Sequence, residues 1–172
     1  MLAPLVRRSL APRGQTPILK QDGGHRQKVS VIAALSLSPK RRQPHLLFQS
    51  IPNAGYDGPR TGLFLRYLLR HLRGNVIVVW DRGSHHRAKV VHDLLIKYPR
   101  LTIEYLPPYA PELNPVEYLW SPLKCSKLAN VCYKDALELD DWITDHLSDY
   151  AENPAILGNF FKATPLHAAL ER

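Results

Sequence analysis

Hydrophobic and polar residues alternate in the first half of the chain in a way that predicts two neighbouring strands. Over residues 29–37 apolar side chains occupy every second position, with Ser30 and Ser36 on the opposite face, which is typical of a half-buried strand. A second strand is expected over residues 45–51, after a short basic connection. Because this connection is short, we expect antiparallel pairing. A further short strand is expected at residues 18–19.

The pattern changes to helical spacing after a Gly- and Pro-rich segment, residues 52–61, which predicts a loop. Phe64, Leu68 and Leu72 then recur along one face, which predicts a helix over residues 62–73. A continuous apolar run at 76–80 is typical of a strand buried on both faces. The other elements expected are a helix over 87–98, a strand over 101–105, a helix from Asn114 that Pro122 kinks or ends, and a helix over 135–150.

This order of elements predicts an α/β fold. The antiparallel strands come first and strand–helix alternation follows, so we expect a mixed sheet with helices packed against it. The length of 172 residues fits one domain. We expect residues 1–150 to form that domain and residues 151–172 to form a C-terminal tail with a short helix.

Composition narrows the function classes. The net charge is +8, which favours binding to a polyanion such as nucleic acid. The alternative is a basic surface that is only solvated and binds no partner. No apolar run approaches the roughly 18 residues needed to cross a bilayer, and the N-terminus lacks a secretory pattern. Cys125 and Cys132 have neither disulfide-framework nor zinc-site spacing. We therefore expect a cytoplasmic protein without membrane contact.

Two acidic residues occupy positions where chemistry is expected. Asp81 directly follows the apolar run at 76–80, and open α/β sheets bind ligands at the carboxyl ends of their strands. Glu117 lies just inside the helix that follows a proline-rich loop, after one helix and one strand have returned the chain to that edge. A pair of carboxylates there can hold Mg²⁺ or Mn²⁺. Such ions activate a nucleophile and stabilise a leaving oxygen in phosphoryl transfer.

Each of these acids also has a structural interpretation. Asp81 alone is equally compatible with capping the next helix. Glu117 alone is better explained by a capping box that begins at Asn114. His85 and His86 lack the Cys/His spacing of a zinc site, so solvent- or phosphate-facing positions are favoured. His86 could also hydrogen-bond metal-bound oxygens.

Two longer motifs decide between these interpretations. They are WDRGSHH at residues 80–86 and LPPYAPELNPVEYLW at residues 106–120. With residues 11–17, they resemble the DDE transposases of bacterial insertion sequences in the mariner-like superfamily, over about residues 5–133. The resemblance implies a ribonuclease-H-like fold. It also implies metal-dependent cleavage and joining of DNA by three acids that bind two divalent metal ions.

The last two of these acids match Asp81 and Glu117, and His86 keeps the family's histidine position. The first aspartate of the family would precede the segment that resembles residues 5–17, and no acid precedes Asp22. Asp22 falls in a Gly-rich turn and Asp57 in a Gly–Pro loop, so neither resembles it. We therefore expect the first strand to be missing or incomplete. The resemblance also implies an N-terminal helix-turn-helix region that reads the ends of the element, and no part of this sequence resembles that region.

These observations predict an N-terminally truncated transposase catalytic domain, impaired when alone. Asp81 and Glu117 would be the catalytic and metal-binding residues, with Mg²⁺ or Mn²⁺ as cofactor. His86 and Asn114 are expected to support the metal ligands. Arg82, Lys124 and Lys127 are expected to contact DNA. Expected partners are transposon-end and target DNA, a second copy, or a full-length transposase. The alternative is a non-catalytic DNA-binding or transposase-interacting fragment.

Overall fold

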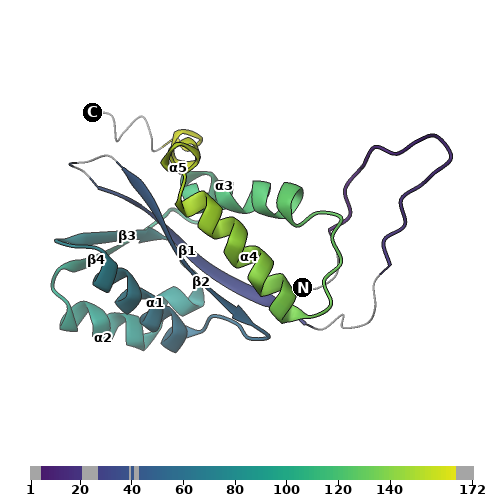
Figure 1. The fold of residues 1–172 in the computed structure, drawn as a ribbon. Helices are drawn as coiled ribbons and strands as arrows, with labels where there is room; N and C mark the ends of the chain where they lie inside the picture. The colour runs from purple at the N-terminus through teal and green to yellow at the C-terminus, as the bar shows by residue number, and fades with distance from the viewer. Residues whose placement is uncertain (1–4, 21–26, 39, 41–42, 166–172) are drawn as a thin grey trace.

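The computed structural model describes residues 5–20, 27–38, 40 and 43–165, so the predicted turn at Asp22 lies outside the described residues (Figure 1). Strands β1 (Val29–Leu37) and β2 (Pro44–Pro52) pair antiparallel, with Val29 opposite Pro52. The alternating pattern had predicted both strands and their pairing, and the structure confirms them. Residues 18–19 form no strand, because this segment is exposed and pairs with no neighbour among the described residues.

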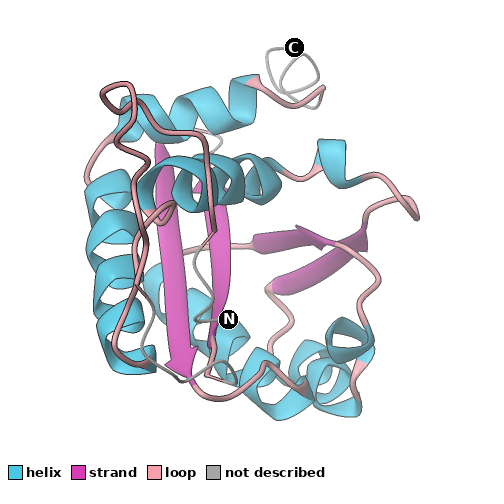
Figure 2. Ribbon diagram, turned by 90° about the vertical axis from the view of Figure 1, so that its right-hand side faces the viewer, coloured by secondary structure: helices cyan, strands magenta, loops and turns pink. Residues whose placement is uncertain are grey.

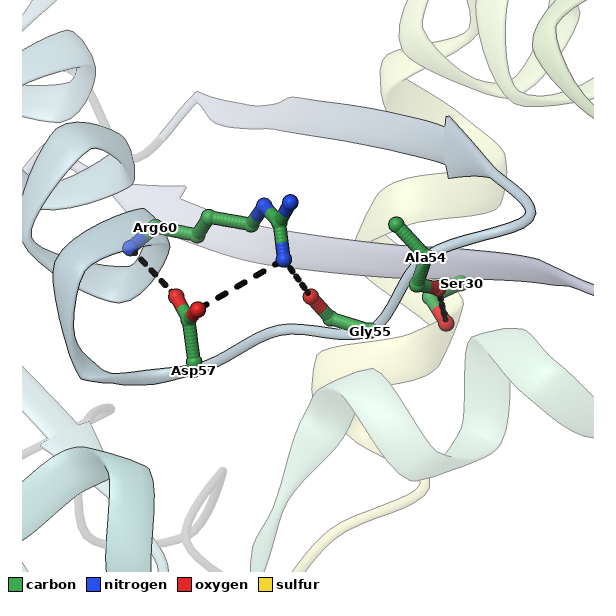
Figure 3. Close-up of polar contacts among 5 residues, drawn as sticks. All are labelled: Ser30, Ala54, Gly55, Asp57 and Arg60. Carbon is green, nitrogen blue, oxygen red and sulfur yellow. Dashed lines mark hydrogen bonds and ion pairs between the residues drawn. The ribbon is translucent and has the colours of Figure 1, made fainter.

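Helix α1 (Gly58–His71) begins four residues before the predicted start. Asp57 caps it by accepting a hydrogen bond from the Arg60 N–H at 2.9 Å, and the Arg60 guanidinium donates to the Gly55 carbonyl at 2.9 Å (Figure 3). The Ser30 hydroxyl holds the preceding turn by donating to the Ala54 carbonyl at 2.6 Å. The segment predicted as a loop therefore contains the capped first turn of a helix.

Strands β3 (Val76–Trp80) and β4 (Leu101–Tyr105) pair parallel. A 3-10 turn, η1 (Ser84–Arg87), and helix α2 (Lys89–Lys97) connect them. The prediction that residues 76–80 are buried on both faces is wrong, because Ile77 and Val79 are 66% and 50% exposed. Helices α1 and α2 both pack on the face that carries Val76 and Trp80.

The two strand pairs are joined by side chains. Among the described residues, no backbone hydrogen bonds link the β1–β2 pair to the β3–β4 pair, and Figure 2 shows them as two separate magenta pairs. Ile32 and Ala34 of β1 pack into the same hydrophobic cluster as Phe64 of α1 and Trp80 of β3. The α/β class is confirmed, but the predicted mixed sheet consists of an antiparallel and a parallel pair.

The second half of the chain covers the other face of β1 and β2. It comprises the 3-10 turn η2 (Pro111–Leu113), α3 (Pro115–Pro122), the π-helical segment η3 (Leu123–Lys127), α4 (Ala136–Ala151) and α5 (Pro154–Lys162). Pro122 ends α3, as expected. Leu119, Leu147 and Leu157, one from each α-helix, are fully buried in the shared core. No helix among the described residues combines the length and apolar character that crossing a membrane requires.

Close packing between α1 and the segment before α2 leads to a prediction at Gly58. A Cβ atom at Gly58 would lie 2.5 Å from the Cβ of Ala88, which no real contact allows. We expect Gly58→Ala to lower the free energy of unfolding by about 1–3 kcal/mol, the usual cost of overpacking. Urea unfolding measures this effect, and adding Ala88→Gly should restore most of the loss. Additive effects of the two substitutions would contradict the predicted contact.

Candidate functional site

The parallel strands β3 and β4 end side by side. Trp80 lies opposite Tyr105, and the Leu106 N–H donates to the Trp80 carbonyl at 2.8 Å. Asp81 therefore leaves β3 beside the start of the proline loop, which leads through η2 to Glu117 in the first turn of α3. Among the described residues, no hydrogen bond or ion pair joins Asp81 to Glu117.

The Asp81 carboxylate is held from one side. Its Oδ1 atom accepts from the Gly83 N–H at 2.8 Å and lies 2.8 Å from Nδ1 of His86. The same nitrogen is 3.2 Å from the Asp81 carbonyl oxygen. Both partners of Nδ1 are acceptors, so Nδ1 carries the proton. The imidazole ring stacks on Trp80, with centroids 4.1 Å apart and planes 5° from parallel.

The electrostatics favour a carboxylate beside a neutral imidazole. Burial opposes ionisation of Asp81, but the hydrogen bond from Gly83 and the nearby His86 outweigh it and lower the Asp81 pKa. Burial lowers the pKa of His86, and His85 lowers it further against the opposing effect of Asp81. With a pKa below its ordinary 6.5, His86 is neutral at neutral pH, and its contact with Asp81 is a hydrogen bond rather than an ion pair.

These contacts exclude helix capping as the role of Asp81. Among the described residues, its side chain accepts only from Gly83 and His86. The N-cap residues of η1 and α2 are Gly83 and Ala88, and neither helix has a side-chain cap. The Asp81 side chain is 67% exposed, and its Oδ2 atom has no partner among the described residues. One carboxylate oxygen is therefore free to bind a ligand.

The capping box that was the alternative interpretation of Glu117 is not formed. Asn114 is the N-cap of α3 and accepts from the Val116 N–H at 3.2 Å. In a capping box, the backbone N–H of Asn114 would donate to the Glu117 carboxylate. Here that N–H donates to the Pro111 carbonyl at 2.9 Å instead. Glu117 is exposed, and its carboxylate has no partner among the described residues. Asn114 therefore starts the helix and leaves the Glu117 side chain free.

The donor atoms fit a hard divalent cation. Carboxylate oxygens are the ligands that Mg²⁺ and Mn²⁺ prefer, and Mg²⁺ usually keeps several water molecules and takes only one or two protein carboxylates. Across the part of the chain that the structure describes, no three His, Cys, Asp or Glu side chains are grouped to hold a metal ion. Asp81 and Glu117 thus offer free oxygens of the right chemistry without a third ligand.

The predicted DNA-contacting residues lie in two places. Arg82 is exposed next to Asp81. Lys124 and Lys127 are exposed on η3, which follows the C-terminal end of α3, whereas Glu117 lies near the N-terminal end of that helix. Sequence reasoning missed Gly83, whose N–H holds Asp81. A Cβ there would lie 3.0 Å from Asp81 Oδ1, so the close turn favours glycine. The only signal was a glycine two residues after the acid.

The proline loop also holds a strained residue. Tyr109 is fully exposed and has a left-handed backbone with φ of 57°. This conformation costs a residue with a Cβ atom about 1–2 kcal/mol. Glycine avoids that cost, but it loses more backbone entropy on folding, which offsets part of the stabilisation. We expect Tyr109→Gly to raise the free energy of unfolding by about 0.5–1 kcal/mol, measured by urea unfolding. Tyr109→Phe, which retains Cβ, should leave it unchanged; equal effects would contradict the strain.

Comparison with known proteins identifies the class to which this fold and site belong. The family model described as DDE superfamily endonuclease matches residues 2–140, so the chain belongs to the DDE superfamily of endonucleases.

Individual proteins are similar to part of this chain in sequence or to its fold. The chain is 42% identical over 70 residues, 40% of its length, to an uncharacterized protein of Sinorhizobium fredii strain NGR234. Its fold is similar to Mos1 transposase in a paired-end complex with the left transposon end, with a TM-score of 0.66, 18% identity and 98% of this chain covered. The catalytic domain of Mos1 mariner transposase gives a TM-score of 0.56 at 15% identity, covering 83% of this chain and 76% of that domain. The ribonuclease-H-like fold is thereby confirmed. The chain spans 45% of the S. fredii protein and 49% of the Mos1 chain in the paired-end complex.

Proposed function

We propose that this chain is the catalytic part of a mariner-like DNA transposase, which cleaves and joins DNA with Mg²⁺ or Mn²⁺. The observation that carries the proposal is the pair of acids Asp81 and Glu117. Both side chains are exposed with free oxygens, and both lie within the residues that match the endonuclease family. The Mos1 catalytic domain, whose fold is similar, has been solved with Mg.

Asp81 and Glu117 are the proposed metal ligands and catalytic residues. A bound divalent ion would supply a nucleophile at neutral pH and stabilise the leaving oxygen of the phosphodiester. Arg82 beside Asp81 and Lys124 and Lys127 on η3 are the proposed contacts to DNA phosphates. Asn114 supports the site by fixing the start of the helix that carries Glu117. Residues 1–150 are proposed as the catalytic domain, in a cytoplasmic protein. The C-terminal tail proposed over residues 151–172 contains α5, which packs on the core of this domain through Leu157.

His86 is proposed to hold the Asp81 carboxylate through Oδ1, which would leave Oδ2 available to bind the metal. His86→Phe keeps a ring against Trp80 but removes the N–H donor, whereas His86→Asn keeps a donor near the Nδ1 position and removes the ring. We expect His86→Phe to weaken Mn²⁺ binding about tenfold, the lower end of the cost of losing a residue that orients a ligand. We expect His86→Asn to retain more of the affinity. Mn²⁺ electron paramagnetic resonance measures the binding.

His85 provides the matched control. Its ring contacts His86 edge-on at 4.0 Å and makes no bond to Asp81, so His85→Phe should leave Mn²⁺ binding unchanged. Equal Mn²⁺ affinity in wild type and His86→Phe would contradict the orienting role of His86.

With two candidate carboxylates, and no set of three metal-ligating side chains among the described residues, the chain alone is proposed to bind metal weakly and to be impaired in strand transfer. The purified chain is incubated with supercoiled plasmid and Mg²⁺ or Mn²⁺. We expect slow, metal-dependent nicking, no nicking in EDTA, and no strand transfer. Robust strand transfer that Asp81→Ala abolishes would show that two acids suffice and would overturn the impairment. No DNA binding and no nicking would overturn the proposed function.

A binding-only role is the second candidate, and the net charge of +8 favours it. In this role the chain binds DNA, a second copy or a full-length transposase without cleaving. DNA binding that falls steeply with salt and is unchanged by EDTA, in the absence of any nicking, would support this candidate over catalysis.

A further inference from the structure

Two segments that lie far apart in the sequence carry basic residues and no acidic ones. Residues 5–20 contain four basic and no acidic residues, and residues 118–134 contain three lysines and no acidic residue. Helix α4, in contrast, has five acidic residues and no Lys or Arg. Both segments therefore carry an excess of positive charge, whereas α4 carries an excess of negative charge.

The fold joins the two basic segments. Leu5 forms a parallel bridge with Ala129, and the Asn130 N–H donates to the Leu5 carbonyl at 3.0 Å. In return, the Arg7 N–H donates to Oδ1 of Asn130 at 2.8 Å. Asn130 has φ of 58°, a left-handed conformation that asparagine tolerates better than most residues. Residues 5–7 are thus fixed beside η3, and residues 8–20 extend away from the body as the purple loop of Figure 1.

The junction forms an open hollow with unneutralised cations. A hollow of about 470 Å³ is lined by Val6, Arg7, Arg8 and Cys125. One guanidinium nitrogen of Arg7 lies 2.7 Å from the Cys125 sulfur, a weak acceptor that leaves the other N–H donors free. Among the described residues, no carboxylate pairs with Arg7 or Arg8, nor with Lys124 or Lys127 on the adjoining η3.

We propose that Arg7, Arg8, Lys124 and Lys127, here called the basic surface, bind the phosphate backbone of duplex DNA. Guanidinium groups recognise phosphate through paired N–H donors, and lysine adds a mobile positive charge. An acid-free surface also attracts a polyanion without reading its sequence. This inference rests on the proposed function, because it takes DNA as the partner. It adds Arg7 and Arg8 to the DNA contacts proposed above. It also places this contact beyond the C-terminal end of α3, whereas Glu117 lies in the first turn of that helix.

The test compares two double variants with the same change in charge. Arg7→Gln/Arg8→Gln alters the basic surface, and Arg66→Gln/Arg70→Gln removes two exposed charges from α1. Binding of a mixed-sequence DNA duplex is measured by fluorescence anisotropy in EDTA across a series of salt concentrations. Each lost phosphate contact reduces the slope of log K against log salt by about 0.9. We expect the first variant to lose up to about 2 in slope and roughly 10- to 100-fold in affinity at 0.1 M salt, and the second to resemble wild type.

The outcomes separate the surface from the function. Equal losses in both variants would show a general charge effect and overturn the basic surface while leaving DNA binding intact. Unchanged binding by Arg7→Gln/Arg8→Gln would do the same. No binding by the wild-type chain at low salt would overturn DNA as the partner and the basic surface with it. All four arginines are exposed, so thermal melting should be unchanged. A loss of self-association in place of DNA binding would assign the surface to a second copy.

Discussion

An Asp81→Asn chain is expected to bind Mn²⁺ about 100-fold more weakly than the wild-type chain, or worse. Losing a residue that merely orients a metal ligand costs about 10–100-fold in affinity, and Asp81 is itself a proposed ligand. The substitution keeps the shape of the side chain, and its amide oxygen can still accept from Gly83 and His86. The fold should therefore persist while the charged ligand is lost. The slow Mn²⁺-dependent nicking of plasmid DNA that we expect of the wild-type chain should also fall by about 100-fold or more.

A matched control removes a carboxylate elsewhere. Asp93 is exposed on α2 and has no partner among the described residues, so Asp93→Asn should leave Mn²⁺ binding and nicking unchanged. Glu117→Gln should act in the same direction as Asp81→Asn, because it removes the second proposed ligand. Wild-type Mn²⁺ affinity in Asp81→Asn would show that this carboxylate does not hold the metal.

Local patterns predicted most elements, because alternation and helical spacing record which face is buried. The boundaries were less certain where one segment carries two signals. Gly58 and Pro59 indicate a turn, yet Pro is also common in the first turn of a helix and Asp57 is a good N-cap. The sequence does not say which applies; the hydrogen bond from the Arg60 N–H to Asp57 decides it.

Long-range packing explains the errors in the sheet. The apolar run of β3 contains Ile77 and Val79, and hydrophobicity alone does not show whether a second layer covers them. Both are at least half exposed because α1 and α2 lie on the opposite face. Similarly, the order of elements predicted one sheet, but the link between the strand pairs is made by Ile32 and Ala34 through the shared core.

The candidate residues could be selected from the sequence, but their hydrogen bonds could not. Residue type and position selected Asp81, Glu117 and His86 as candidates. Excluding the capping alternative required knowing that Asn114 donates to Pro111 and that Asp81 accepts from Gly83. Both alternatives use the same residues at the same spacing, so only the backbone conformation separates them.

Leu119→Ala is expected to lower the free energy of unfolding by about 2–5 kcal/mol, the range for emptying a fully buried leucine site. Leu119 is 0% exposed and packs in the core formed by α3, α4, α5 and β1–β2. It lies two residues after Glu117, so the same helix turn joins the core to the candidate site. Urea unfolding measures the loss.

The control is Leu137→Ala on α4, where the side chain is 62% exposed and the cost should stay within about 0.5 kcal/mol. Because the core holds α3 in place, Leu119→Ala should weaken Mn²⁺ binding only under conditions in which unfolded chain accumulates. Lost Mn²⁺ binding in a fully folded Leu119→Ala chain would instead show that packing at Leu119 sets the position of Glu117. A loss of stability no larger than that of Leu137→Ala would contradict the burial of Leu119 in the core.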